Sequence, residues 1–375
     1  MHGASAVRIA RLVSGLILMA FVASHLANLS LGIRSLAAME AWRATLTGPW
    51  TRGAGFFLLA TAALIHASLG LYAIAARRSL TLSATDVVQL ALGLLTPPLL
   101  IAHAVALHTA IRVAPHFADS YGQIQAVYWS FAPSYAFLQL VVVVVVWIHA
   151  AIGLYSWLVL KPVWRRIGGL VLPLLFAVPI LALLGFAQSG QEVLDRLASD
   201  PAWRAMILEN VERVARATRE LGDLQSRALM VWAALVAAAF GILAARILRH
   251  RLKPVAVAYD GGVQAFGRYR LSILEISLLN DVPHAHVCSG RGRCGTCRVR
   301  VDAGADQLSA PDGLERDTLA RVGADMGERL ACQAQVLGEG IKVTRLLPAY
   351  ADASAARAPQ EWVGDAGAPA REPAA

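Results

Sequence analysis

Six long apolar runs, separated by shorter polar segments, fill the first 250 residues of the 375-residue chain. They lie near residues 9–33, 54–76, 87–111, 135–160, 168–188 and 227–248. An α-helix needs about 20 predominantly apolar residues to cross a bilayer. The pattern therefore predicts an all-α membrane domain, a bundle of six spanning helices, over residues 1–250.

Basic residues gather at one side of these runs. The ends on that side carry Arg8, Arg11, Arg77, Arg78, Lys161, Arg165, Arg166, Arg246, Arg249, Arg251 and Lys253. The opposite loops carry Arg34, Arg43, Arg52 and Arg112, and the long segment 189–226 mixes its arginines with acidic residues. Because Lys and Arg are in excess in cytoplasmic loops, both termini are expected in the cytoplasm. Within the long segment, residues 201–221 are predicted to form one amphipathic helix on the outer face.

Composition agrees with a membrane protein. The chain is 57% hydrophobic and only 16% charged, with a mean hydropathy of +0.54, which is more apolar than ordinary soluble domains. The net charge of +9 comes largely from basic residues at the ends of apolar runs. That placement is typical of membrane proteins and argues against nucleic-acid binding. The first run is too long for a cleavable signal peptide, and none is expected.

The pattern changes at Pro254. Segments 255–259 and 263–270 indicate a β-hairpin around Asp260-Gly261-Gly262. A helix is predicted at 271–279, a strand at 298–301, a helix near 313–321 and closing strands near 331–336 and 340–346. This order predicts a soluble α+β domain over residues 254–348. Residues 349–375 are rich in Ala and Pro and are expected to be a disordered tail.

The four cysteines of the chain all lie in this domain. Cys288, Cys294, Cys297 and Cys332 have the spacing C-x5-C-x2-C-x34-C. Three thiolates on one glycine-rich loop and a fourth far downstream suit a [2Fe–2S] cluster held by four sulfurs. Gly290, Gly292 and Gly295 allow the backbone to wrap tightly and to direct N–H groups at the sulfurs.

Two other uses of these cysteines are less favoured. Structural zinc sites usually show two close cysteine pairs rather than three cysteines on one loop. Disulfides are disfavoured because a cytoplasmic domain keeps its thiols reduced. His284 and His286 precede Cys288 and could replace a cysteine ligand, but four cysteines suffice. With His2, His116 and His250, they are interpreted as surface or loop residues.

Four consecutive predicted helices each carry a mid-membrane histidine: His25, His66, His103 and His149. Ionisable side chains inside a membrane are costly and mark candidate functional sites. A lone buried histidine is more often a hydrogen-bonded core residue, but four on successive helices favour axial ligation of haem. Each haem iron takes two axial ligands. The four histidines therefore predict two b-type haems, with a single haem as the alternative.

The second and fourth helices share a heptapeptide pattern. His66-Ala-Ser-Leu-Gly70-Leu-Tyr72 matches His149-Ala-Ala-Ile-Gly153-Leu-Tyr155. Each glycine lies on the face of its histidine, where a flat porphyrin would press on the backbone, although glycines also serve helix packing. Counted at about 1.5 Å per residue from the flanking charges, His66 and His149 are roughly 16–18 Å from the inner flank. His25 and His103 are roughly 21–25 Å away by the same count. This predicts an inner pair, His66 with His149, and an outer pair, His25 with His103.

The first 250 residues resemble the six-helix cytochrome b sensor domain of bacterial membrane-bound class III adenylate cyclases. That domain is itself similar to the dihaem membrane anchors of succinate dehydrogenase and fumarate reductase. The matching stretches are 21–32, 63–77, 98–112 and 147–166. Residues 254–348 resemble the β-grasp ferredoxin domain that follows in the same cyclases, through Pro283-His284-Ala285, the Cys288–Cys297 loop and Arg329-Leu-Ala-Cys332-Gln. The cyclases continue into a catalytic domain, whereas this chain has a short Ala/Pro tail, so cyclase activity is not expected of it.

These features favour a membrane-bound electron-transfer protein that links a cytoplasmic [2Fe–2S] cluster to b-type haems and the quinone pool. The alternative is a redox or quinone sensor that acts on a separate signalling partner such as an adenylate cyclase. A self-contained quinone or ferric reductase is less favoured, since no G-x-G-x-x-G follows a strand and no catalytic domain is evident. The expected setting is a bacterial inner membrane. The expected partners are quinone, a soluble redox or signalling protein and a second copy of the chain.

Overall fold

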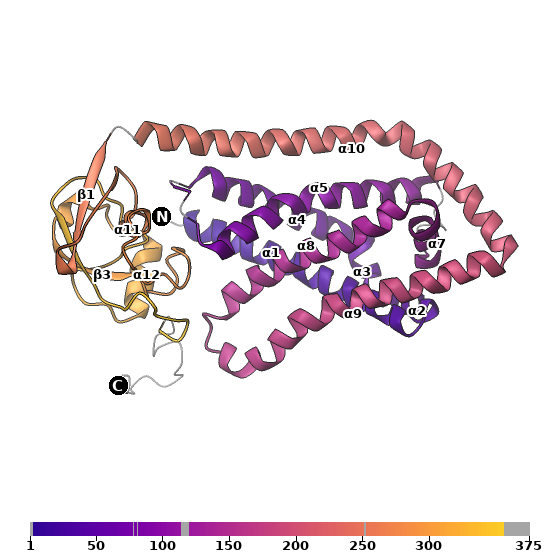
Figure 1. Cartoon of the computed structure of the whole chain (residues 1–375), viewed down its shortest axis with the longest axis horizontal. Helices are drawn as coiled ribbons and strands as arrows, with labels where there is room; N and C mark the ends of the chain where they lie inside the picture. Colours follow the sequence, from indigo (N-terminus) through magenta and orange to yellow (C-terminus); the bar gives the residue numbers. More distant parts are fainter. Residues whose placement is uncertain (1–2, 78, 81, 114–119, 251–252, 356–375) are drawn as a thin grey trace.

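The computed structural model describes residues 3–77, 79–80, 82–113, 120–250 and 253–355. A long helical region is followed by a small domain built on a mixed sheet, which lies against one end of the helices (Figure 1). The order of the two parts agrees with the predicted membrane and soluble domains.

Six helices of the described chain are long and apolar enough to cross a membrane. They are α1 (Gly3–Ser30), α4 (Gly53–Ala75), α5 (Ala84–Val113), α8 (Pro133–Leu158), α9 (Trp164–Ser199) and α10 (Pro201–His250). Shorter elements join them: η1 (Leu31–Ile33), α2 (Leu36–Leu46), α3 (Gly48–Thr51), α7 (Tyr121–Ala126) and the π-helix η2 (Val127–Phe131). All six predicted apolar runs are thus confirmed as helices.

The helices pack so that α1 lies against α4 and α9, and α5 lies against α8 and α10. The close packing of α1 and α9 depends on glycine, because a Cβ at Gly185 of α9 would collide with the carbonyl oxygen of Leu29 in α1. Large apolar side chains point outward, and Phe57, Leu64 and Phe176 are each about 70% exposed. A surface of this kind is suited to hydrocarbon, where helices keep all their backbone hydrogen bonds internal.

The helix predicted at 201–221 is confirmed, but its predicted end at 221 is wrong. Those residues are the first part of α10, a single helix of 50 residues that also contains the sixth span. Figure 1 shows α10 running along the bundle from its far end to the start of the small domain. A polar stretch does not end a helix unless a helix-breaking residue follows it. Gly222 alone is too weak a breaker, because glycine in a helix costs only about 1 kcal/mol relative to alanine.

The small domain is a five-stranded sheet with the order β2-β1-β5-β3-β4. The strands are β1 (Pro254–Tyr259), β2 (Gln264–Arg268), β3 (Arg298–Ala303), β4 (Glu328–Leu330) and β5 (Ile341–Arg345). β1 pairs with β2 in an antiparallel hairpin and with β5 in parallel. β3 is antiparallel to both β4 and β5. The predicted hairpin, the strand at 298–301 and the last strand are confirmed.

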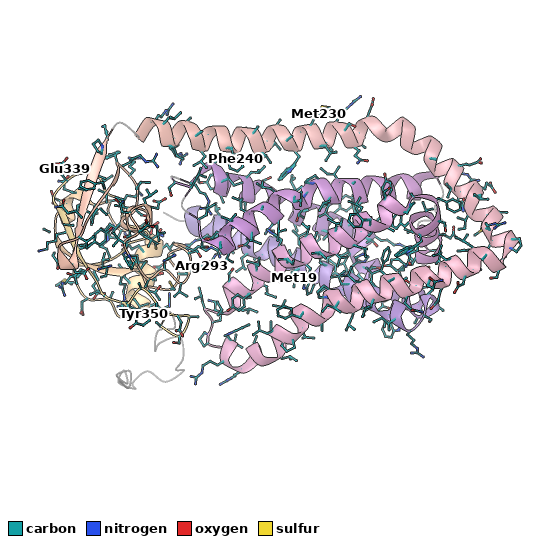
Figure 2. All side chains as sticks on the ribbon, in the orientation of Figure 1. Met19, Met230, Phe240, Arg293, Glu339 and Tyr350 are labelled. Atoms are coloured by element: carbon teal, nitrogen blue, oxygen red, sulfur yellow. The ribbon has the colours of Figure 1, made fainter. Side chains whose placement is uncertain are left out.

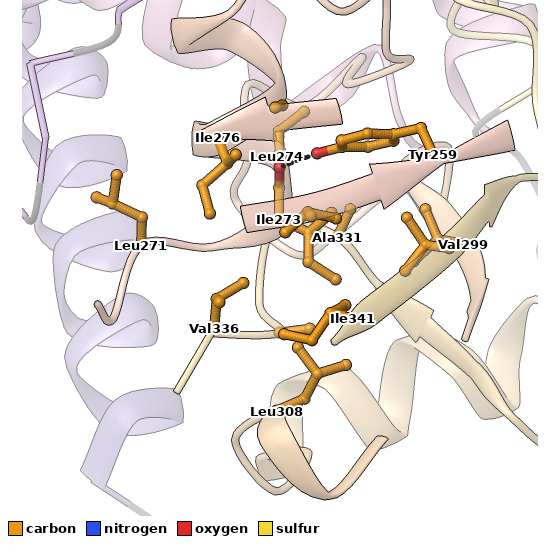
Figure 3. Packing of buried hydrophobic residues seen from close by; sticks show 14 of the residues in the cluster. Tyr259, Leu271, Ile273, Leu274, Ile276, Val299, Leu308, Ala331, Val336 and Ile341 are labelled. Atoms are coloured by element: carbon orange, nitrogen blue, oxygen red, sulfur yellow. Dashed lines mark hydrogen bonds between the residues drawn. The ribbon is translucent and has the colours of Figure 1, made fainter. Parts of the chain in front are cut away.

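Two helices cover the sheet, α11 (Ile273–Leu279) and α12 (Gly313–Arg321). The start of α11 is fixed by a capping box, in which Ser272 and Glu275 satisfy each other's backbone N–H groups. Apolar residues of α11 pack into one core with residues from β1, β3 and β5, including Ile273, Val299 and Ile341 (Figure 3). Tyr259 is held in this core by its hydroxyl, which donates to the carbonyl oxygen of Ile273 at 3.1 Å.

The predicted strand at 331–336 is also wrong. The strand there is β4, at Glu328–Leu330, and residues 331–336 form only isolated bridges, Ser272 to Gln335 and Leu308 to Val336. Ala331, Ala334 and Val336 are all fully buried, so their burial does not alternate as it does in a half-buried strand. The chain leaves the sheet after Leu330, and Cys332 lies in the departing segment. Residues 349–355 form turns, and the predicted disordered stretch from 356 onward lies outside the described residues.

Candidate functional site

The four cysteines come together from two segments of the small domain. Cys288, Cys294 and Cys297 lie on the loop between α11 and β3, and Cys332 follows β4. The loop turns through left-handed backbone conformations at Ser289, Gly290, Gly292 and Gly295, with φ between 52° and 74°. The N–H of Ala331 donates to the carbonyl oxygen of Cys297 at 3.0 Å, which joins the two segments.

The cysteines are arranged as two pairs. The thiol of Cys288 interacts with that of Cys294, and the thiol of Cys297 interacts with that of Cys332. Two pairs of thiols side by side suit the two irons of a [2Fe–2S] cluster, which four cysteine sulfurs hold.

The surroundings favour negative charge at Cys288, whereas the neighbouring thiols and burial raise the pKa of Cys294 and of Cys332. The N–H of Arg293 points at the sulfur of Cys288, with an N···S distance of 3.5 Å. Hydrogen bonding from the Cys294 thiol, aided by backbone N–H groups and opposed by burial, lowers the pKa of Cys288 to about 5. The hydroxyl of Thr296 lies 3.1 Å from the sulfur of Cys294, and the amide of Gln333 donates to the sulfur of Cys332 at 3.2 Å. The predicted direction of backbone N–H groups at the sulfurs is confirmed for Cys288.

His284 lies in a loop, as the prediction of a surface or loop residue allowed, but the side chain is buried. It is only 4% exposed, and its Nδ1 lies 2.9 Å from the hydroxyl of Ser277, which also contacts the hydroxyl of Tyr259. Burial lowers the pKa of His284 to about 4, and its ring lies beside the backbone of Cys297. His284 therefore ties the cysteine loop to α11 and β1. His286 is half-buried, and its Nδ1 donates to the carbonyl oxygen of His284 at 2.7 Å.

His66 and His149 face each other inside the helical region. Their ring centroids are 6.2 Å apart and their planes are nearly perpendicular, at 85°. Metal–imidazole bonds of about 2 Å place the centroids of two axial rings roughly 6 Å apart. The inner pair therefore has the spacing that two ligands of one metal require.

The tautomer of each inner histidine is fixed by a backbone carbonyl. Nδ1 of His66 lies 3.2 Å from the carbonyl oxygen of Arg11, and Nδ1 of His149 lies 3.0 Å from that of Gln89. A ring nitrogen beside a carbonyl oxygen carries the proton, which leaves Nε2 of each ring available as a ligand. Haem-binding and metal-binding histidines commonly show this arrangement.

Two glycines that the sequence pattern did not single out make room for these rings. A Cβ on Gly15 would lie 2.9 Å from Cε1 of His66, and a Cβ on Gly93 would lie 2.7 Å from Cε1 of His149. Each glycine lies four residues after the residue whose carbonyl holds the ring, Arg11 or Gln89. Each also lies ten residues before the outer histidine of its helix, since 25 − 15 and 103 − 93 are both 10. The repeated spacing was present in the sequence and identifies α1 and α5 as equivalent helices.

The rings of the predicted outer pair, His25 and His103, are not brought together as those of the inner pair are. The ring of His25 stacks on Phe21 with centroids 5.7 Å apart, and its Nδ1 lies 3.4 Å from the hydroxyl of Tyr121. The His103 side chain hydrogen-bonds to that of Gln139, and its Nδ1 is buried without a hydrogen-bond partner among the described residues. His25 and His103 lie close enough to interact electrostatically, but no contact between their rings occurs within the described part of the chain.

The glycines of the heptapeptide have different surroundings. A Cβ on Gly153 would lie 3.2 Å from Nε2 of Gln89, so Gly153 makes room for that side chain. Gly70 faces open space in the described part of the chain, because a Cβ added there would have no heavy atom of another described segment within 4 Å. The prediction that both glycines lie against porphyrin remains a prediction.

The cysteine loop lies against the helical region at the end nearest the inner pair. Cys288 and Cys294 pack with Leu160, which follows α8, and Val159 and Val287 cover the edge of this contact. Arg293 of the loop lies on the side of the small domain that faces the helices (Figure 2). Burial, followed by the charge of Arg291, lowers the pKa of Arg293.

Arg291 makes the polar part of this contact. Its guanidinium donates to Oδ1 of Asp86 at 2.8 Å, to Oε1 of Gln89 at 3.2 Å and to the hydroxyl of Ser156 at 3.1 Å. A second link joins the hydroxyl of Ser79 to Oε1 of Glu275 at 2.6 Å. Gln89 thus touches the cysteine loop through its side chain and the inner histidine pair through its backbone.

Residues 268–337 match the family described as the 2Fe-2S iron-sulfur cluster binding domain. The "2Fe-2S ferredoxin-5" of Aquifex aeolicus is 36% identical over 70 residues, which cover 73% of that protein and 18% of this chain. The "Chlorosome protein I" of Chlorobaculum tepidum is 35% identical over 69 residues, which cover 28% of that protein and 18% of this chain. Among solved structures, an ISC-like [2Fe-2S] ferredoxin from Pseudomonas putida is 26% identical with a TM-score of 0.22, and the match covers 94% of that chain and 26% of this one.

Proposed function

Because the C-terminal domain of this chain belongs to the [2Fe–2S] ferredoxin family, we propose that the whole protein is a membrane-bound electron-transfer protein. In this proposal it connects the cluster to b-type haems in the helical region and to the quinone pool. A bound cluster or haem supplies one-electron chemistry that side chains alone lack. Cys288, Cys294, Cys297 and Cys332 hold the two irons, and His25, His66, His103 and His149 are the axial ligands of the haems.

One observation carries the proposal. The inner histidine pair and the cysteine loop lie at the same end of the helices, and Gln89 contacts both. The residues around them hold each centre in place: backbone carbonyls orient His66 and His149, and Arg291 fixes the loop. The apolar side chains of Val159 and Leu160 keep water from the space beside Cys288 and Cys294.

The charge bias of the loops supports an orientation. Lys and Arg are concentrated at the end of the helices that carries the ferredoxin domain, and such ends face the cytoplasm. We therefore place both termini and the ferredoxin domain in the cytoplasm, with the helices in a bacterial inner membrane. The soluble partner that exchanges electrons with the cluster is then a cytoplasmic protein.

The direct test is the cofactor content of the purified chain in detergent. A reduced-minus-oxidised spectrum, with iron, sulfide and haem measured per chain, is expected to show one [2Fe–2S] cluster and about two b-type haems, since each haem takes two of the four histidines. Cluster without haem would contradict the proposal while leaving the ferredoxin domain intact.

A redox or quinone sensor acting on a separate partner, such as an adenylate cyclase, is the second candidate. The small set of polar contacts between the domains favours it, because such a contact can break without unfolding either domain. Turnover separates the two functions. A carrier passes electrons continuously from a soluble reductant to a quinone, whereas a sensor changes its redox state once and then stops.

A further inference from the structure

We propose that Arg291 is a positioning residue that holds the ferredoxin domain against the inner histidine site, with the Cys288–Cys294 side of the cluster facing His149. The inference rests on the proposed function for its electron-transfer consequence. The contact itself depends only on residues of this chain.

The partner of Arg291 is a carboxylate that is already fixed. Asp86 lies in the first turn of α5, and its Oδ2 accepts from the hydroxyl of Ser83 at 2.7 Å. Its Oδ1 accepts from Arg291 at 2.8 Å. The side chain of Asp86 is 9% exposed and that of Arg291 is 29% exposed. A pair this well shielded is screened less than a surface pair, and removing one partner leaves the other partly buried without its counter-charge.

The position of Arg291 in the loop determines which side of the cluster faces the helices. It lies between Cys288 and Cys294, and this cysteine pair packs on Leu160. The other pair, Cys297 and Cys332, is joined to β3 and to the end of β4. The side of the cluster held by Cys288 and Cys294 therefore faces the membrane helices.

The three acceptors of Arg291 lie on the two helices that enclose His149. Asp86 and Gln89 belong to α5, whose Gly93 faces the ring of His149. Ser156 belongs to α8, seven residues after His149 on the same helix. A displacement of Arg291 would act on Gln89, whose carbonyl oxygen lies 3.0 Å from Nδ1 of His149. The same guanidinium therefore sets the position of the loop and supports the helix turn that orients this histidine.

Other positive charges make Asp86 important for the contact. Arg77 lies within electrostatic range of Asp86, Glu275 and Arg291, and burial, more than these charges, lowers its pKa. Arg293 adds a further positive charge beside Arg291. Replacing Asp86 by a cation would therefore place like charges together, which costs several times more than the loss of one hydrogen bond.

The test uses the full chain in lipid nanodiscs and four variants. Asp86→Asn leaves the cysteine loop unchanged, Asp86→Lys adds repulsion, and Asp86→Lys with Arg291→Asp restores an opposite pair in reversed order. Asp302→Asn is the matched control, because Asp302 pairs with Arg300 and Thr344 within the ferredoxin domain. Hydrogen–deuterium exchange is followed over residues 288–294 and 156–161, a readout that does not require haem.

Exchange in both segments is expected to rise roughly tenfold in Asp86→Lys and less in Asp86→Asn, because a partly buried pair is lost. The control is expected to behave as the wild type, and the reversed pair is expected to recover protection. Unchanged exchange in Asp86→Lys would overturn the inference. If the variant with the reversed pair loses its iron, the outcome is taken from Asp86→Asn instead. Wild-type exchange in Asp86→Asn would then overturn the inference.

The second readout is kinetic and uses protein loaded with its cofactors. The cluster is reduced by a light flash with an external donor, and haem absorbance is followed. Asp86→Lys is expected to lower the rate of haem reduction at least tenfold, in proportion to its loss of docking. The rate of cluster reduction is expected to stay unchanged. An equal rate of haem reduction in the wild type and Asp86→Lys contradicts the positioning role of Arg291. Absence of a haem spectrum in the wild type contradicts only the proposed function.

Discussion

Each inner histidine occupies a space that a glycine on the facing helix leaves open. His149 fits against Gly93 and His66 fits against Gly15, and in both cases a methyl group would approach the ring to less than 3 Å. The sequence allowed both histidines to be predicted as ligands, because an ionisable residue in an apolar run is conspicuous. The role of the two glycines could not be predicted from the sequence, because a single glycine among apolar residues is common. Which side chain it faces is determined only by the packing of the helices.

Gly93→Ala is therefore expected to displace His149 and to remove the inner haem. Overpacking of this kind costs about 1–3 kcal/mol. Haem content, measured by pyridine haemochrome, is expected to fall from about two to about one per chain, because one axial ligand is misplaced.

Gly241→Ala is the matched control. Gly241 lies in α10, which carries none of the four candidate histidines, and a methyl group added there would have no heavy atom of another described segment within 4 Å. This variant is expected to keep both haems and to gain up to about 1 kcal/mol of helix stability. Equal haem content in Gly93→Ala and the wild type would argue against the histidine–glycine fit.

At the scale of elements, the sequence predicted helices and strands well where a periodic pattern was bounded by turn residues. Ser272 before α11, Asp312 before α12 and the Asp260-Gly261-Gly262 turn are such boundaries. The errors arose where tertiary contacts decide the backbone path. Residues 331–336 leave the sheet because Cys332 must reach the cysteine loop, and α10 continues through a polar stretch because no strong helix breaker interrupts it.

A buried ion pair helps to set the path of the segment that carries Cys332. Glu315 of α12 is 1% exposed and accepts from Nε of Arg329 at 2.8 Å and from the N–H of Leu330 at 2.9 Å. Arg329 also donates to the carbonyl oxygen of Ser309 at 2.7 Å. These bonds hold the end of β4 just before Cys332.

Glu315→Ala is expected to destabilise the ferredoxin domain by about 3–5 kcal/mol, because Arg329 is left buried without its partner. Urea unfolding of the full chain, followed by the visible absorbance of the cluster, is expected to show a midpoint lower by at least about 1 M. Asp302→Ala removes a more exposed pair and is expected to leave the midpoint nearly unchanged. If the two variants unfold alike, Glu315 does not support the segment.

At the scale of the molecule, the order of a six-helix region and a ferredoxin domain was readable from hydropathy and cysteine spacing. Their docking was not, because Arg291, Asp86 and Ser156 are far apart in the sequence and ordinary in type. The shared heptapeptide already relates α4 to α8, whereas the equivalence of α1 with α5 rests on the histidine–glycine contacts of the structure. Together these features place the inner histidine pair next to the cysteine loop, which is the basis of the electron-transfer proposal.

The central claim is that His66 and His149 bind the same haem, next to the cluster. It is tested most directly by the haem content and low-temperature spectra of His66→Ala, His149→Ala and the double variant. Each single variant is expected to lose the same spectral component and about one haem per chain, and the double variant is expected to lose no more. Loss of different components in the two single variants, or loss of both haems only in the double variant, would contradict the account.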